Sequence, residues 1–191
     1  TACSRAPRCR LVAVRGLGQV GLRASPNRFV FFTVSLAKTV AYRAGAILGP
    51  KQLSETLPFV AYPAIFSSTV LPQEVARLEK TLAVIKSSDD KREVLFERAK
   101  SLTTGLKQIG FNIRSESQII ALECGNERNT ERVRDFLEER DVFGSVFCRP
   151  ATVKNKSIIR FSVNADMTPK DIDHVLTVCH EAYHHPGLGF V

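Results

Sequence analysis

An apolar run that ends at a lysine is the feature that most limits how this chain can fold. Nine consecutive, largely apolar residues, 29–37, precede Lys38, and a second apolar stretch follows, interrupted at Tyr42 and Arg43. A run that is apolar on both faces predicts a buried central strand of an α/β sheet. Ligands in such sheets bind beyond the strand ends, so Lys38 stands at the expected edge of a site. An ammonium group there is costly unless it is paired or neutralised.

The composition indicates a globular chain with a substantial core. The chain has 191 residues, of which 44% are hydrophobic, and this is enough for one domain or two small ones. No apolar segment reaches the roughly 18 to 20 uncharged residues that a membrane span requires. The five cysteines form no Cys-x-x-Cys pair, and their odd number argues against a disulfide framework. We therefore expect a cytoplasmic protein without a membrane span.

The net charge of +8 is concentrated at the start of the chain. Residues 1–28 contain six arginines and no acidic residue, so the remainder is nearly balanced. The segment could be a basic arm for nucleic acid or an anionic surface, or an organellar transit peptide. It lacks the interleaved aromatic residues of a nucleic-acid platform. We therefore favour an atypical segment, and expect no nucleic-acid partner.

A glycine pattern in the same segment suggests dinucleotide binding, but its context does not fit. Gly16, Gly18 and Gly21 form the spacing GxGxxG after a short apolar run. Only seven residues, "LRASPNR", separate Gly21 from the next apolar run, and a crossover helix needs about ten. No acidic residue follows about 20 positions later to bind a ribose, because the first one in the chain is Glu55. We expect no dinucleotide cofactor.

Helical and strand patterns alternate after residue 72. The predicted elements are helices over 72–88 and 89–110, a strand over 119–124, a helix over 129–140, strands over 143–148 and 157–163, and a closing helix. Thr168 and Asp171 form an N-cap pair for the closing helix, with Pro169 at its first position. In the strand over 157–163, Arg160 falls on the more polar face. This alternation predicts an α/β or α+β domain over residues 90–191, preceded by a connecting helix over 73–89.

The closing helix also carries a zinc-peptidase pattern. His180 and His184 lie one turn apart with Glu181 between them, and this is the HExxH spacing. Only seven residues follow His184, so a third ligand would have to come from an unsignalled position upstream. A polar helix terminus explains the histidines as well, because imidazoles suit the negative end of the helix dipole. We expect no metal site, and a zinc peptidase is the least favoured function.

The chemistry expected of Lys38 depends on its surroundings. Desolvation at a strand end favours the neutral amine, which condenses with an aldehyde. Hydroxyl groups at Thr33, Ser35 and Thr39 could bind a phosphate, and Arg43 could add positive charge. The alternative is a lysine whose stem packs on apolar surface while its ammonium reaches water. The residues alone leave both interpretations open.

A resemblance favours the first interpretation. The segment "SLAKTVAYRAG" resembles the pyridoxal-phosphate lysine signature of class-II aminotransferases and α-oxoamine synthases. It departs from that signature at Thr39, where the family usually has Ala, Ser or Gly. Three later segments also resemble the family in the right order: "IFSSTVLP", "CRPATV" and "IIRFSVNADMTPKDID". In detail the chain is most similar to the quorum-sensing autoinducer synthase branch.

The resemblance implies a fold and a set of site residues. The fold would be the C-terminal part of a PLP-dependent transferase of fold type I, with 29–72 as a remnant of the large-domain sheet and 90–191 as the small domain. Lys38 would be the catalytic lysine that binds the cofactor, and Arg160 would bind the substrate carboxylate. The remaining implied residues are Ser35, Ser67, Ser68 and Thr69 for the cofactor phosphate, the last three across a homodimer, and Arg149 for the substrate.

The implied activity is an acyl transfer. Members of this branch join an acyl-CoA to an amino acid or an amino-acid-derived substrate and yield an aminoketone, with pyridoxal 5'-phosphate as the cofactor. The other parts of the family's large domain are not recognisable in residues 1–28, so we expect a truncated chain with an unmatched arm. The alternative function is a non-catalytic fragment or a binding module with a basic N-terminal arm.

Overall fold

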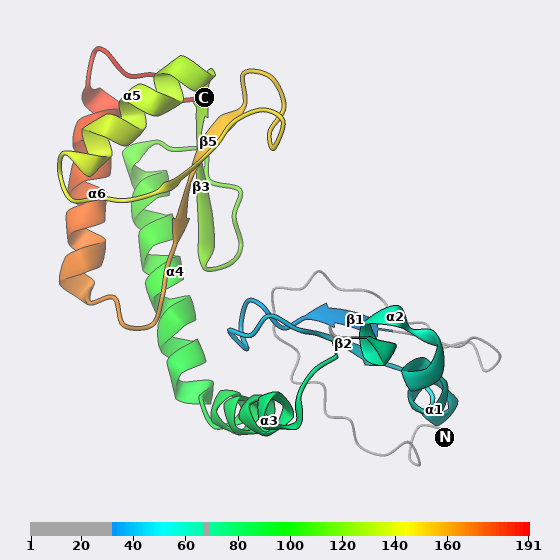
Figure 1. Cartoon of the computed structure of the whole chain (residues 1–191). Coiled ribbons are helices and arrows are strands. Elements are labelled where there is room, and N and C mark those ends of the chain that lie inside the picture. The colour runs from blue at the N-terminus through cyan, green and yellow to red at the C-terminus, as the bar shows by residue number, and fades with distance from the viewer. Residues whose placement is uncertain (1–31, 67–68) are drawn as a thin grey trace, which may run out of the picture. The chain divides into compact units, whose positions relative to one another are not determined.

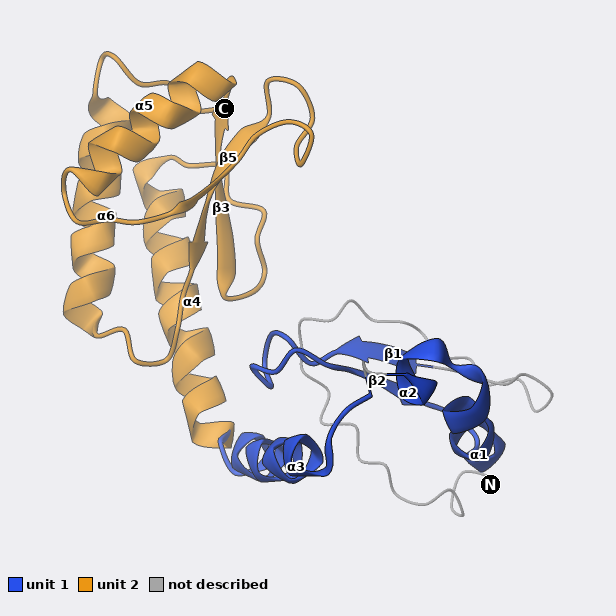
Figure 2. Cartoon of the chain, viewed as in Figure 1, with its two compact units in different colours: residues 1–88 blue, residues 89–191 orange. Residues whose placement is uncertain are grey.

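The computed structural model describes residues 32–66 and 69–191, and the chain divides into two compact units. The first unit extends to Ser88 and the second runs from Asp89 to Val191 (Figure 2). The predicted GxGxxG spacing, the six arginines of 1–28, Ser67 and Ser68 all lie outside the described residues. No helix of the described part is long and apolar enough to cross a membrane.

The first unit contains a two-stranded sheet and three helices. Strands β1 (Phe32–Ser35) and β2 (Gly45–Leu48) pair antiparallel, with Phe32 opposite Leu48 and Ser35 opposite Gly45. The helices are α1 (Lys51–Val60), α2 (Tyr62–Ile65) and α3 (Pro72–Lys86) (Figure 1). Helix α3 begins where predicted, with Pro72 in its first turn and the Glu74 carboxylate accepting a 2.7 Å hydrogen bond from the Leu71 amide.

The prediction of a buried central strand over 29–37 is wrong for the described residues. Strand β1 is only four residues long, and its side chains alternate between half-buried and exposed. Among the described residues its one partner is β2. A pair of antiparallel strands has two edges and cannot bury both of its faces without further layers. Accordingly, no described residue of the first unit is fully buried.

The second unit is a three-stranded antiparallel sheet with helices packed on it. Its elements are α4 (Asp89–Ile109), β3 (Ile119–Gly125), α5 (Glu127–Glu138), β4 (Ser145–Phe147), β5 (Ser157–Ser162) and α6 (Pro169–His184). The strand order is β3-β5-β4, so β5 is central. Figure 1 shows α4 and α6 side by side against this sheet, with α5 above them. All the predicted elements of this region are confirmed, and their order gives the predicted mixed helix and sheet domain.

The core of the second unit lies between the helices and one face of the sheet. The fully buried side chains come from every helix and from both long strands: Leu102, Leu106, Ile120, Leu122, Val133, Leu137, Ile159 and Ile172. Strand β5 alternates in burial along its length, as the sequence predicts, so Ile159 and Phe161 face the core and Arg160 faces away from it. The opposite face of the sheet is therefore the open one.

Turn chemistry sets the ends of these helices. Helix α4 ends just before Gly110, whose φ of +122° suits glycine, and a Cβ there would lie 2.6 Å from the Tyr183 hydroxyl. Helix α6 begins with the predicted cap: the Thr168 hydroxyl accepts from the Asp171 amide at 3.3 Å, and the Asp171 carboxylate accepts from the Thr168 amide at 2.6 Å. The glycine thus marks the end of α4, and the Thr168–Asp171 pair marks the start of α6.

Candidate functional site

Lys38 lies in the loop that joins β1 to β2. Short backbone hydrogen bonds close this loop, from the Leu36 amide to the Ala44 carbonyl at 2.9 Å and from the Ala41 amide to the Lys38 carbonyl at 3.0 Å. Ala41 has a φ of +52°, an uncommon conformation for a residue with a Cβ. The Lys38 side chain is exposed, and it makes no ion pair among the described residues. The loop thus presents a primary amine that a ligand can reach.

The hydroxyl groups expected near Lys38 are only partly described. Ser35 is exposed, and its Oγ accepts a long, 3.4 Å hydrogen bond from the Ala37 amide. Thr33 and Thr39 are exposed as well. Thr69 is exposed, and its amide donates to the Phe66 carbonyl at 3.3 Å. The hydroxyls of Ser35, Thr39 and Thr69 are therefore accessible to an anionic ligand.

Tyr42 anchors the Lys38 loop to α3. Its hydroxyl hydrogen-bonds the Glu74 carboxylate, and the Arg77 guanidinium carbon lies 5.4 Å from the centroid of its ring. Glu74 and Arg77 are three residues apart, so both reach the same point from one helix face. Sequence reasoning noted Tyr42 only as an interruption of the apolar run. Its spacing from α3 carries no local pattern that would have revealed the contact.

Arg160 projects from the open face of the second unit's sheet. Its neighbours across the strands are small: Ala121 on β3 and Ser145 on β4. The guanidinium carbon lies over the Phe147 ring, 4.5 Å from its centroid. The side chain is half-buried, and its Nε is buried without a hydrogen-bond partner in the described part of the chain.

No carboxylate pairs with Arg160 among the residues that the structure describes. The nearest acidic side chain by register is that of Glu123, opposite Ile158, and its ion-pair partner at 4.0 Å is Lys156. A surface ion pair therefore does not account for Arg160 in the described part of the chain. Arg160 is a half-buried cation whose remaining hydrogen-bond donors are available to an anion.

The other predicted residues fall into separate places. Arg149 is exposed in the turn that follows β4, where the Ala151 amide donates to the Cys148 carbonyl at 2.9 Å. Lys38, Ser35 and Thr69 belong to the first unit, whereas Arg149 and Arg160 belong to the second. The roles that the resemblance implies for Lys38 and Arg160 stay predictions.

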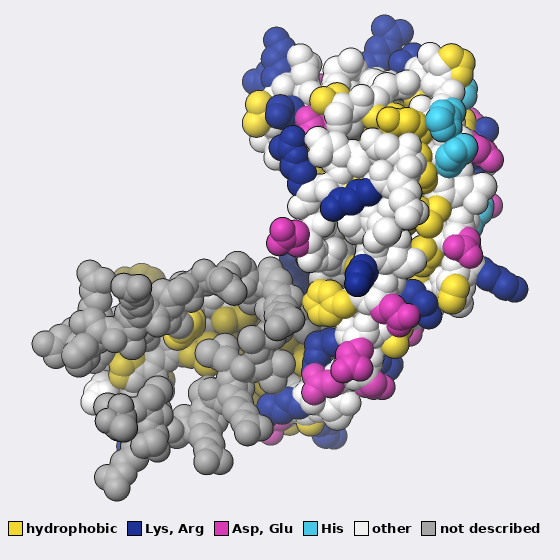
Figure 3. Space-filling view, turned by 180° about the vertical axis from the view of Figure 1, so that it is seen from behind, with side chains coloured by type: hydrophobic (Ala, Val, Ile, Leu, Met, Phe, Trp, Pro, Cys, Tyr) yellow, Lys and Arg dark blue, Asp and Glu magenta, His cyan; other side chains and the backbone are white. Residues whose placement is uncertain are grey.

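The HExxH residues lie at the end of α6, where their side chains contact other side chains. The His180 and His184 ring centroids are 4.5 Å apart, and Figure 3 shows histidine side chains grouped on the surface of the second unit. Glu181, which would be the base of a zinc peptidase, pairs with Arg140 at 3.3 Å. The described residues contain no group of three or more His, Cys, Asp or Glu side chains that could hold a metal ion.

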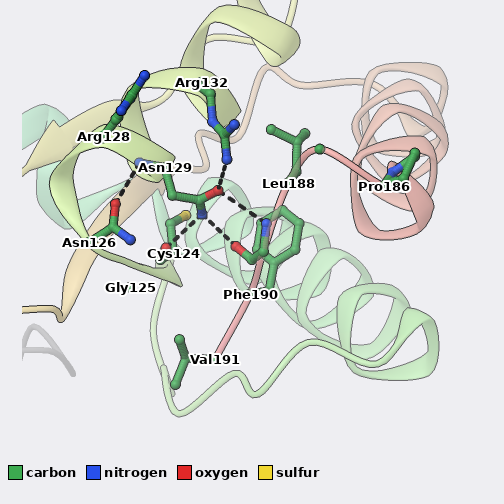
Figure 4. A pocket seen from close by; sticks show the side chains of 12 residues that line it. Cys124, Gly125, Asn126, Arg128, Asn129, Arg132, Pro186, Leu188, Phe190 and Val191 are labelled. Carbon is green, nitrogen blue, oxygen red and sulfur yellow. Dashed lines mark hydrogen bonds between the residues drawn. The ribbon is translucent and has the colours of Figure 1, made fainter.

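A surface pocket of about 670 Å³ lies between the start of α5 and residues 186–191. Figure 4 shows Asn129 at its centre: its amide nitrogen donates to the Cys124 and Gly189 carbonyls at 2.7 and 2.6 Å. Its amide oxygen accepts from the Gly189 amide and from Arg132. Every polar atom of this buried side chain thus has a protein partner, and none is left for a ligand. The pocket contains none of the predicted site residues.

The buried cysteines stay protonated at neutral pH and are therefore poor nucleophiles. Burial raises the pKa of Cys124 and of Cys179 to about 12 in each case. Because the thiolate is the nucleophilic form, neither side chain is available for covalent catalysis at neutral pH. The three cysteines of the described part, Cys124, Cys148 and Cys179, are free thiols.

Solved structures share the fold of this chain. A structure of SPT with PLP matches at a TM-score of 0.71 and 24% identity, covering 79% of this chain and 39% of that one. An 8-amino-7-oxononanoate synthase from Francisella tularensis matches at a TM-score of 0.67 and 19% identity, covering 80% of this chain and 45% of that one. These matches confirm the predicted fold, part of the fold type I architecture.

Curated proteins give a nearer likeness. The CAI-1 autoinducer synthase of Vibrio campbellii is 80% identical over 175 residues, which are 92% of this chain and 44% of that protein. The 8-amino-7-oxononanoate synthase of Petrotoga mobilis is 29% identical over 144 residues, 75% of this chain and 37% of that protein. The chain therefore spans less than half the length of these relatives.

The profile of one protein family matches most of the chain. The match extends over residues 7–178, and so it begins within the 1–28 segment that we had expected to be unmatched. It includes Lys38, Arg149 and Arg160. The chain belongs to the aminotransferase class I and II family.

Proposed function

We propose that this chain is part of a pyridoxal-phosphate-dependent acyltransferase that condenses an acyl-CoA with an amino acid or an amino-acid-derived substrate to form an aminoketone. The autoinducer synthase at 80% identity supports this proposal most directly. The observation that carries it is the state of Arg160, a half-buried arginine with no carboxylate partner in the described part and a buried Nε without a hydrogen bond. Such a group is suited to a substrate carboxylate.

The residues of the Lys38 loop fit an aldehyde cofactor that carries a phosphate. Lys38 offers an accessible primary amine, and Ser35 and Thr69 offer exposed hydroxyls. Together with Ser67 and Ser68, these residues would hold pyridoxal phosphate, the 67–69 segment from the partner subunit of a homodimer. When bound, the cofactor supplies an electron sink for the bonds at the substrate Cα.

The chain's own side chains would then orient the substrate and move its proton. Arg160, assisted by Arg149, would hold the carboxylate through paired N–H donors, and this fixes which Cα bond faces the lysine. The Lys38 amine would remove and return the proton at the substrate Cα. Tyr42, tied to Glu74 on α3, would steady the loop that carries Lys38. We further propose that the protein acts in the cytoplasm.

The test is whether the cofactor becomes attached to Lys38. We would replace the corresponding 175 residues of the Vibrio campbellii relative by those of this chain. The relative then supplies the rest of the protein. Pyridoxal phosphate is added, the visible absorbance is recorded, borohydride fixes any lysine adduct, and peptide mass spectrometry locates it. We expect attachment at Lys38, lost in Lys38→Ala and retained in Lys51→Ala, another exposed lysine of the same unit. Attachment elsewhere, or none, would favour the non-catalytic alternative.

A further inference from the structure

We infer that Phe147 is a positioning residue for the carboxylate site, holding the Arg160 guanidinium by its face so that its edge stays free for a ligand. This inference rests on the proposed role of Arg160. It adds a second residue, on another strand, which no pattern in the sequence marks.

The register of the sheet brings the two side chains together. Ser145 lies opposite Arg160 and Phe147 lies opposite Ile158, so Phe147 and Arg160 are diagonal neighbours on one face of β4 and β5. Aromatic and long side chains reach one another across such a diagonal. The 4.5 Å between the guanidinium carbon and the ring centroid is within the range of a cation–π contact.

The position of Phe147 does not suit a core residue. Phe147 is half-buried on the open face of the sheet, opposite the helices that cover Ile159 and Phe161. Its neighbour Val146 points the other way, toward the core, because successive side chains of a strand alternate. An aromatic ring on the open face, in contact with the one arginine of the adjacent strand β5, therefore needs an explanation other than core packing.

A ring and a carboxylate hold a guanidinium in different ways. The five N–H donors of arginine lie in the plane of the group, whereas an aromatic ring attracts the cation through its face. A carboxylate partner would occupy the donors and offset the charge. Phe147 does neither, so Arg160 keeps its charge and its in-plane donors while losing rotational freedom.

The flanking residues place no charged group against Arg160. Ala121 and Ser145, directly across the two strands, are small and carry no charge. Glu123 lies farther along the same face with Lys156 as its ion-pair partner. The arrangement is a cation fixed in orientation with no acidic group of the described part in contact with it. Its complement is a planar monocarboxylate that approaches in the guanidinium plane.

The test is a titration of the 191-residue chain with sodium propionate, monitored by the NMR signal of the Arg160 Nε–H group. Propionamide, which has the same shape without the charge, is the matched control. We expect propionate to shift the signal saturably and propionamide to leave it in place. Replacing the ring by a similar volume, in Phe147→Leu, should raise the Kd for propionate about threefold to tenfold, whereas Phe147→Tyr should keep it near that of the parent chain.

Ring electronics separate positioning from packing. Incorporating 4-fluoro- and then pentafluorophenylalanine at position 147 keeps the ring shape while weakening and then reversing its quadrupole. We expect the propionate Kd to rise stepwise along this series, with unchanged backbone amide signals of β4 and β5 as the folding control. Kd values that do not respond to the fluorine content or to Phe147→Leu would overturn the role of Phe147 and leave that of Arg160 intact. Propionate-induced shifts of the β4 and β5 backbone amide signals that persist unchanged in Arg160→Lys would instead overturn the carboxylate role of Arg160.

Discussion

Asn129 and Gly189 exchange two hydrogen bonds although 60 positions separate them in the sequence. The Asn129 Nδ2 donates to the Gly189 carbonyl at 2.6 Å, and the Gly189 amide donates to the Asn129 Oδ1 at 3.1 Å. A side-chain amide thus pairs with a backbone peptide as a neighbouring strand would. Because Nδ2 also donates to the Cys124 carbonyl, one buried side chain joins the end of β3, the start of α5 and the C-terminal segment.

Replacing Asn129 should destabilise the second unit. Asn129→Ala leaves the Cys124 and Gly189 carbonyls without their donor, and we expect the free energy of unfolding to fall by about 1 to 3 kcal/mol. Urea denaturation, monitored by the NMR signals of the second unit, measures the change. Glu131→Ala, an exposed change on the same helix, should stay within about 0.5 kcal/mol. Equal stability of the two variants would show that the hydrogen bonds of the Asn129 side chain contribute nothing to the free energy of unfolding.

The cap of α6 should be measurable in both stability and titration. Thr168→Ala removes the hydroxyl that accepts from the Asp171 amide. We expect the free energy of unfolding to fall by about 1 kcal/mol. Hydrogen bonds from the Thr168 amide and hydroxyl lower the pKa of Asp171. The stabilising effect of the ionised Asp171 is therefore complete above its ordinary pKa of about 3.9, and it disappears as the pH falls through the lower pKa of the folded state.

An NMR titration of the Asp171 carboxyl carbon checks the cap directly. In Thr168→Ala the side-chain hydroxyl is gone and the backbone donor remains, so the pKa of Asp171 should move upward toward its ordinary value. Thr177→Ala, later in the same helix, is the control, because its hydroxyl bonds the Asp173 carbonyl and does not contact Asp171. An unchanged pKa in Thr168→Ala would contradict the proposed cause.

Alkaline pH should destabilise the second unit through its buried thiols. The pKa of Cys124 and of Cys179 is raised by burial to about 12, whereas an unfolded thiol ionises at about 8.5. Above about 8.5 the unfolded state binds fewer protons than the folded state, so stability falls as pH rises, by up to about 1.4 kcal/mol per pH unit for each thiol. Urea denaturation at a series of alkaline pH values measures the slope.

Matched variants assign this slope to the thiols. Cys179→Val keeps an apolar side chain and removes one titrating group, so the slope should become shallower. Val178→Ala removes buried volume from the adjacent position without removing a thiol, and it should lower stability while keeping the slope. A slope that Cys179→Val leaves intact would argue against this origin.

The histidines of α6 should not bind zinc in stoichiometric amounts. Glu181 is paired with Arg140, and two imidazoles alone leave a divalent ion short of protein ligands. We expect the metal content of the purified chain, measured by atomic emission, to be the same in the parent and in His180→Ala. Stoichiometric zinc that disappears in His180→Ala would reverse this expectation.

The second unit could be predicted from its sequence because its signals are local. Thr168, Pro169 and Asp171 identify the start of α6 within four residues, and the alternation of β5 places Arg160 on the open face without any knowledge of its partners. Such signals depend on propensity, capping and period, all of which act over one or two turns. The resemblance to the family likewise rests on short segments, each of which can be recognised without knowing its contacts.

What the sequence could not supply depends on contacts between distant residues. The apolar run over 29–37 predicted a buried strand, yet burial requires neighbouring layers that the two-stranded sheet of the first unit does not have. The contact of Phe147 with Arg160 depends on the register of β4 against β5, which is set across the intervening turn. The contact of Tyr42 with Glu74 likewise joins a loop to a helix 32 positions later. Neither contact leaves a periodic trace in the sequence.

The outer edge of β3 also determines how this sheet meets other chains. The Ile119 and Ala121 amides donate to the Ser117 and Ser115 hydroxyls, and the Glu123 carbonyl accepts from the Val191 amide. The opposite edge strand, β4, is only three residues long. An uncovered edge is a template on which a second molecule can add a strand and start aggregation. Two serines and the C-terminal segment thus occupy this template, and trimming residues 187–191 should make the protein more prone to self-association.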